Sequence, residues 1–208
     1  MCVFYGHPAL VGLSGVAAGL VLSWLLRPWV ALRLAAVLGL TVLAGALSVL
    51  IAYRFAGDPA LPAWWWLAVT GVGLSLIDMT CHRLPHTWVL ALATGGLAVF
   101  AILAMTEQAG TGLVRALLAA LVVFTGGLAL FLALPDWMGF GDITTTAALA
   151  IYLGWIGWHA VLLGITASML LLGGLAAQAW TRTPNSRVAA GPSLLLGGWI
   201  SILTHTTA

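Results

Sequence analysis

Two aspartates stand where apolar stretches of the sequence meet polar breaks. Asp78 follows the apolar segment 72–77, and Asp142 follows the glycine-containing segment 139–141. A carboxylate costs about 2.5 to 3.5 kcal/mol at the centre of a membrane helix and less near the interface, so such a group usually faces the protein interior or a wet cavity. The other three acids fall in predicted loops or interfacial breaks, where water solvates a charge: Asp58, Glu107 and Asp136. Asp78 and Asp142 are therefore the candidates for chemistry.

A pair of carboxyl groups can hydrolyse an amide without any other catalytic side chain. Two carboxyls brought together across helices resist ionising together, so one keeps a proton while the other is a base. The base can activate a water, and the acid can polarise the scissile carbonyl and protonate the leaving amine. We predict Asp78 and Asp142 as this pair, with Gly139, Phe140 and Gly141 shaping the substrate groove, since glycine permits close approach. No metal ion and no cofactor are expected.

Both aspartates also have a structural interpretation, which the residues alone leave open. Asp142 would cap a helix that begins at Ile143, because Asp is a favoured N-cap residue. Asp78 would form an ion pair with Arg83, whose planar fork suits a carboxylate. The spacing in the sequence does not show whether the two carboxyl groups meet.

The composition is typical of a membrane protein. Of the 208 residues, 62% are hydrophobic and 6% are charged, and the mean hydropathy is +1.13. Because hydrocarbon offers no partner for exposed backbone groups, and the apolar runs are continuous rather than alternating, we predict an all-α, polytopic helical bundle. There is room for about seven or eight transmembrane helices in a single domain, residues 1–208. The predicted spans are 8–26, 30–53, 63–80, 87–105, 112–134, 143–157, 159–180 and 191–204.

The positive charges are few and unevenly placed. The net charge is +2, with seven arginines and no lysine, too few for a nucleic-acid footprint, so we expect no nucleic-acid partner. Successive breaks between predicted spans lie on alternate faces of the membrane. One face then has five arginines and the other has two: Arg27, Arg33, Arg83, Arg182 and Arg187 against Arg54 and Arg115. The positive-inside rule makes the first face cytoplasmic, and the breaks near Asp78 and Asp142 fall on it. Trp64, Trp65 and Trp66 begin a predicted span and are expected to anchor it at headgroup level.

Four short motifs follow one another in the second part of the chain. Asp78 precedes Arg83-Leu-Pro85, and Gly139-Phe-Gly-Asp142 is followed by Leu153-Gly-Trp155 and then by Gly191-Pro192. In this order they resemble the motifs of type IV prepilin peptidases, intramembrane aspartic peptidases of the Gly-x-Gly-Asp kind. The resemblance covers residues from about 65 to 203.

The resemblance implies an activity, a substrate and a location. Family members are aspartic endopeptidases that cleave the short basic leader of prepilin-like proteins at the cytoplasmic face of the plasma membrane, after a glycine and before a hydrophobic helix. The resemblance implies that Asp78 and Asp142 are the catalytic residues. We expect Arg83 to bind substrate together with the segment 139–141. The expected partners are a prepilin-like protein and membrane lipid.

The sequence also departs from the family pattern. Thr144 stands where a lysine is common, His86 replaces a frequent acid after the first motif, and Ala190 replaces a phenylalanine before Gly-Pro. The methyltransferase part of the larger members, with its paired cysteines, has no counterpart here, so we expect a minimal peptidase-only form without N-methylation.

Two other functions fit the same residues. An inactive family member would bind pilin subunits as a scaffold, and a proton-coupled transporter would use the two aspartates as a relay. Transporters often show internal repeats with broken helices, and we find no convincing repeat in the sequence. The sequence predicts neither the oligomeric state nor the identity of the substrate.

Overall fold

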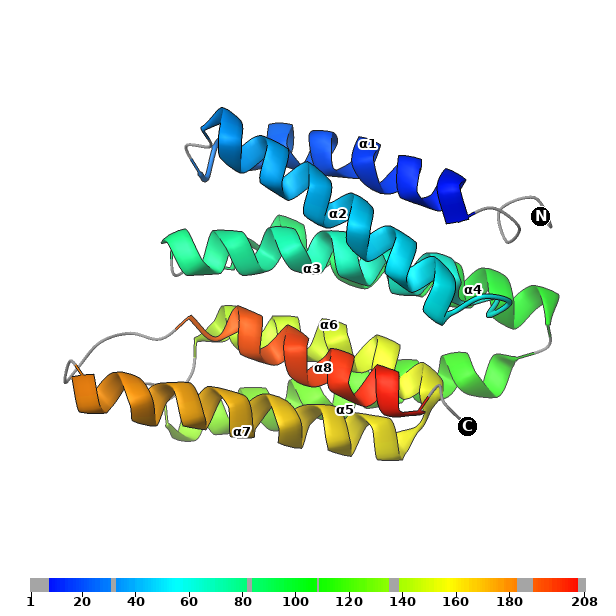
Figure 1. Cartoon of the computed structure of the whole chain (residues 1–208). Coiled ribbons are helices and arrows are strands. Elements are labelled where there is room, and N and C mark those ends of the chain that lie inside the picture. Colours follow the sequence, from blue (N-terminus) through cyan, green and yellow to red (C-terminus); the bar gives the residue numbers. More distant parts are fainter. Residues whose placement is uncertain are drawn as a thin grey trace.

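The computed structural model describes residues 8–30, 33–81, 84–107, 109–134, 139–182 and 189–205. In these ranges the regular structure consists of eight α-helices without strands, which confirms the predicted all-α bundle (Figure 1). The helices are α1 (Pro8–Leu26), α2 (Leu34–Arg54), α3 (Leu61–Cys81), α4 (His86–Thr106), α5 (Gly110–Ala133), α6 (Phe140–Ile156), α7 (Trp158–Arg182) and α8 (Gly191–His205).

Each predicted span corresponds to one helix, and the largest differences are at two helix starts. α2 begins at Leu34 instead of residue 30, after Arg33 in extended conformation. α6 begins at Phe140 instead of Ile143, after Gly139 in extended conformation. The helix thus begins three residues before the predicted span, and Asp142 lies in its first turn instead of at the N-cap. An acid in the first turn can bind the same free backbone N–H groups.

The outer surface of the bundle is apolar. Large hydrophobic side chains are exposed on α1, α2, α5 and α7, for example Leu13, Val42, Leu132 and Leu170. Five helices are long and apolar enough to cross a bilayer, namely α2, α3, α4, α5 and α7, whereas α1, α6 and α8 are shorter. An apolar exterior of this extent requires lipid as the solvent, so the chain is a membrane protein.

Neighbouring helices alternate in direction. The last residues of α1, α3, α5 and α7 lie at one end of the bundle, together with the first residues of α2, α4, α6 and α8 (Figure 1). Asp78, near the end of α3, and Asp142, at the start of α6, are therefore at the same end. Arg27 and Arg33 flank that end, whereas Arg54 lies at the opposite one.

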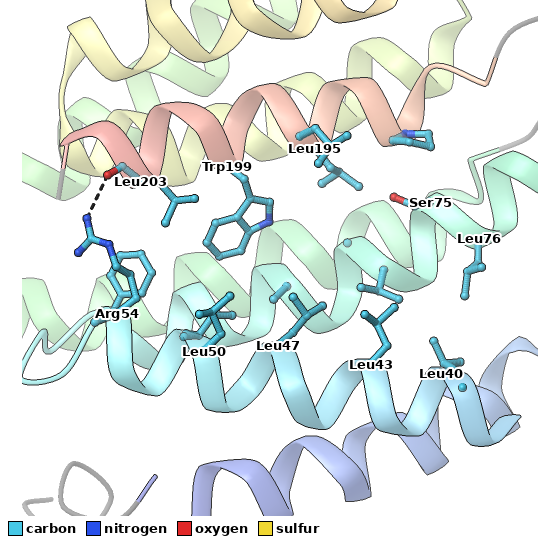
Figure 2. A pocket seen from close by; sticks show the side chains of 18 of the residues that line it. Leu40, Leu43, Leu47, Leu50, Arg54, Ser75, Leu76, Leu195, Trp199 and Leu203 are labelled. Atoms are coloured by element: carbon cyan, nitrogen blue, oxygen red, sulfur yellow. Dashed lines mark hydrogen bonds between the residues drawn. The ribbon is translucent and has the colours of Figure 1, made fainter. Parts of the chain in front are cut away.

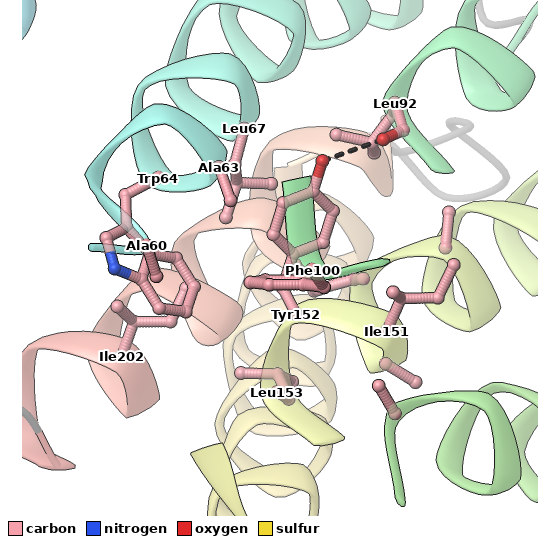
Figure 3. Close-up of a cluster of buried hydrophobic side chains, with 14 of the residues drawn as sticks. Ala60, Ala63, Trp64, Leu67, Leu92, Phe100, Ile151, Tyr152, Leu153 and Ile202 are labelled. Atoms are coloured by element: carbon pink, nitrogen blue, oxygen red, sulfur yellow. Dashed lines mark hydrogen bonds between the residues drawn. The ribbon is translucent and has the colours of Figure 1, made fainter. Parts of the chain in front are cut away.

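The core is centred on three aromatic residues from α3, α4 and α6. The ring centroids of Trp64 and Phe100 are 5.9 Å apart, and those of Phe100 and Tyr152 are 5.6 Å apart (Figure 3). The buried hydroxyl of Tyr152 donates a 2.7 Å hydrogen bond to the carbonyl of Leu92. Gly96 faces the Tyr152 ring so closely that a side chain would not fit. This packing fixes α6 against α3 and α4 and so fixes the position of its first turn.

The expected anchoring role of Trp64 was wrong. Trp64 is 1% exposed, and its indole N–H donates to the carboxylate of Asp58 at 2.9 Å. Trp65 donates to Ser48, and Trp66 donates to the carbonyl of Ala91. Trp64 is therefore a core residue, and Asp58 satisfies its N–H, because a buried indole still needs a partner for that group. Trp65 and Trp66 are half-buried and link α3 to α2 and to α4 through their hydrogen bonds. Asp58, interpreted from the sequence as a solvated loop acid, is a partner in this network.

Candidate active site

Asp78 lies in the last turn of α3 and is 5% exposed. Its Oδ2 accepts a 2.7 Å hydrogen bond from the backbone N–H of Gly191, the first residue of α8. A helix N-terminus presents unpaired N–H groups and a partial positive charge, both of which favour a carboxylate. The Gly-Pro motif at the start of α8 thus supplies a direct backbone contact to the first aspartate.

Asp142 lies in the first turn of α6 and is half-buried. Its Oδ2 accepts a 3.3 Å hydrogen bond from the N–H of Gly139, the residue before the helix. Part of the structural interpretation therefore holds, because the carboxylate satisfies one backbone donor at the helix start. The second carboxylate oxygen and its remaining lone pairs leave capacity for another partner.

The fold brings Asp78 and Asp142 close enough for their charges to interact. Asp78 lies on α3 and Asp142 on α6, and they are 64 positions apart in the sequence (142 minus 78). Near the site, the first turn of α6 packs closely on the segment before α4: a Cβ on Gly141 would lie 3.1 Å from Cβ of Leu84. A larger residue at 141 would require these two segments to move apart by a few tenths of an ångström.

Phe140 forms an aromatic wall next to Asp142. Its ring centroid lies 5.9 Å from that of His86, 6.1 Å from that of Phe131 and 6.5 Å from that of Phe124. The Phe140 side chain is 40% exposed, so one part of it packs on α4 and α5 while another part remains accessible. Gly139 is exposed beside it. The segment 139–141 can therefore contact a ligand that reaches Asp142.

Some of the predicted residues do not enter this geometry. Arg83, predicted to bind substrate, lies outside the described residues. The hydroxyls of Thr144, Thr145 and Thr146 donate to carbonyls of their own helix. Within the described ranges, no group of three or more His, Cys, Asp or Glu side chains is placed to hold a metal ion.

Two contacts of the helices that carry the aspartates were not predicted from the sequence. One is the Gly191 N–H bond to Asp78, which no side-chain pattern encodes. The other is Arg115 of α5, whose guanidinium donates to the carbonyls of Gly154, Trp155 and Ile156 at the end of α6. An arginine inside an apolar span needs a polar partner within the protein, so the position of Arg115 in the predicted span 112–134 could have indicated such a contact. Arg115 holds the far end of the helix whose first turn carries Asp142.

The chain was compared with known proteins. It is 29% identical over 170 residues to the "Prepilin leader peptidase/N-methyltransferase" of Aeromonas hydrophila, an alignment that covers 78% of the chain and 56% of that relative. The chain is therefore similar in sequence to a prepilin leader peptidase. The protein of the same name in Aeromonas salmonicida strain A449 is also 29% identical, over 171 residues, with the same two coverages.

The relationship confirms the resemblance that the motifs indicated. The chain spans just over half the length of the prepilin leader peptidases it matches, 56% in each case. No protein-family model matches the chain. No solved structure matches it either.

Proposed function

We propose that the chain is a membrane-embedded aspartic endopeptidase in which Asp78 and Asp142 form the catalytic pair. The observation that carries the proposal is the placement of both carboxyls at the same end of the bundle, near enough for their charges to interact, in a chain similar to the prepilin leader peptidases. Buried or half-buried acids that lie near one another are candidates for catalytic groups. Among the described residues, each carboxyl accepts a backbone hydrogen bond that orients it, from Gly191 and Gly139 respectively.

The proposed reaction is direct hydrolysis of a peptide bond. Two adjacent carboxyls share one proton, so the pair contains one acid and one base. The base removes a proton from a water, and the water oxygen attacks the carbonyl carbon while the acid donates a hydrogen bond to the carbonyl oxygen. The C–N bond then breaks as a proton passes to the leaving nitrogen, giving a new carboxylate and a new amine. The pair returns to its singly protonated state.

The proposed substrate is a prepilin-like protein with a basic leader. Cleavage would occur at the cytoplasmic face of the plasma membrane, because Arg27 and Arg33 flank the end of the bundle that holds Asp78 and Asp142. Arg83 and the segment 139–141 would contact the peptide near the cut. The exposed part of Phe140 offers it an apolar surface.

A reconstituted assay tests the proposal. The purified chain in liposomes is mixed with a synthetic peptide that has a basic leader, a glycine and an apolar helix of about 20 residues, and mass spectrometry identifies the products. The proposal expects one new pair of ends after the glycine. An uncut peptide in liposomes of several lipid compositions and over a wide pH range would contradict it.

A further inference from the structure

A long apolar groove lies between α2, α3 and α8, outside the aromatic core. Its volume is about 750 Å³, and its polar side chains are Arg54 and Ser75, apart from the indole of Trp199. Figure 2 shows leucines of α2, among them Leu43 and Leu47, directed toward the side chains of α8 across this space. Nothing in the mechanism proposed above uses the groove.

The groove extends over the length of a membrane-spanning helix. On α2 its lining begins at Ala36 and ends at Arg54. Eighteen residue steps at 1.5 Å each make about 27 Å, close to the roughly 30 Å of a hydrocarbon core. One lipid tail reaches only to the bilayer midplane, so the groove is long enough for an element that crosses the whole membrane.

The two ends of the groove differ. At one end Nη2 of Arg54 donates a 3.0 Å hydrogen bond to the carbonyl of Leu203 and ties α2 to α8 (Figure 2). At the other end the lining includes Ser75 and Pro192. Ser75 lies one turn before Asp78, and Pro192 follows the residue whose N–H binds Asp78. The groove therefore ends about one helical turn from Asp78, one of the two carboxyls.

We propose that this groove binds the apolar transmembrane helix of the peptide substrate, with the end of the helix nearest the scissile bond beside Asp78. The inference rests on the proposed function and adds where the uncut part of the substrate is held. Small exposed residues in the lining on α2, Ala36 and Gly39, let a second helix approach closely, as in other membrane helix pairs. Binding there positions the peptide bond at the membrane face while the helix stays in the bilayer.

Filling the groove tests this by kinetics. Leu43→Trp places a bulky side chain in it, and Val42→Trp is the matched control, because Val42 is the exposed neighbour on α2 that does not line the groove. For the peptide with its helix, Leu43→Trp should lower kcat/KM by about tenfold, mainly through KM. For a short peptide that ends soon after the glycine, both variants should match the parent. Equal kinetics of Leu43→Trp and parent on the long peptide would overturn the inference.

Photo-crosslinking tests helix binding in the groove independently of the proposed catalytic activity. A photoreactive amino acid replaces Leu43 or, as control, Val42, in the Asp78→Asn background, and the synthetic peptide is added in liposomes. Crosslinks from position 43 to the apolar helix, with few from 42, support the groove even if the parent chain cleaves nothing. Crosslinks from 43 to lipid alone overturn the groove even if cleavage is observed.

Discussion

The backbone N–H of Gly191 donates a 2.7 Å hydrogen bond to Oδ2 of Asp78, across 113 positions of the sequence. The bond joins the first residue of α8 to the last turn of α3. A Cβ on Gly191 would lie 3.0 Å from the same oxygen and 3.2 Å from Cβ of Asp78. The backbone N–H makes the hydrogen bond, and the absence of a side chain at Gly191 permits the close approach that the bond needs.

Gly191→Ala should impair activity without removing a carboxyl. The added methyl displaces Asp78 by a few tenths of an ångström and weakens a hydrogen bond to a charged group, which is worth about 1.5 to 3 kcal/mol, so kcat should fall about tenfold or more. Gly173→Ala is the control, because Gly173 has open space around it. Peptide cleavage rates of the two variants at equal protein concentration check this; equal rates would contradict the positioning role of Gly191.

Gly96→Ala should destabilise the bundle. The new methyl would overlap the ring of Tyr152, which is fully buried and bound to Leu92. Overpacking of this kind costs about 1 to 3 kcal/mol. Gly126→Ala, at a position with nothing within 4 Å, should leave stability unchanged or raise it slightly. Thermal unfolding in detergent compares the two, and a melting temperature for Gly96→Ala equal to that of the parent would count against the packing described.

Arg115→Gln should loosen α6 at the end remote from Asp142. The variant loses the charged donor that binds three carbonyls at the helix C-terminus, among them Gly154 at 2.7 Å and Ile156 at 3.2 Å. Hydrogen bonds to charged groups contribute about 1.5 to 3 kcal/mol, so unfolding should occur at a clearly lower temperature. Arg27→Gln, at an exposed helix end, is the matched control. Faster hydrogen exchange confined to α6 would locate the effect, and unchanged exchange there would refute it.

The number and order of helices could be predicted because each apolar run is long enough to be recognised without knowing its neighbours. The position of Asp78 and Asp142 at the same end of the bundle could be predicted by counting the polar breaks between the predicted spans. The contacts that orient them could not be predicted in the same way. Gly191 acts through a backbone N–H, and its partner is determined by how α3 and α8 pack. Trp64 was misassigned because position near a helix end says nothing about which way the side chain points.

The orientation of the bundle can be tested independently of activity. The arginine distribution predicts that the connection after α7 is cytoplasmic and that the end of α8 faces the other side. A fluorescent protein that folds only in the cytoplasm should be bright when fused after Arg182, and alkaline phosphatase, which is active only outside, should be active when fused after Ala208. The reverse pattern would place Asp78 and Asp142 on the outer face and contradict a cytoplasmic cut.

The catalytic pair is tested most directly by cleavage of the synthetic peptide by Asp78→Asn and Asp142→Asn. Both variants keep the shape of the side chain and remove its titrating carboxyl, and Glu107→Gln, at an exposed acid outside the site, is the control. Membrane insertion and melting temperature of all three are measured first. The account predicts that the parent and Glu107→Gln cut the peptide, whereas each aspartate variant loses at least about 1,000-fold in kcat, since neither half of the acid–base pair works alone. Cleavage that survives either aspartate substitution at the parent rate would contradict it.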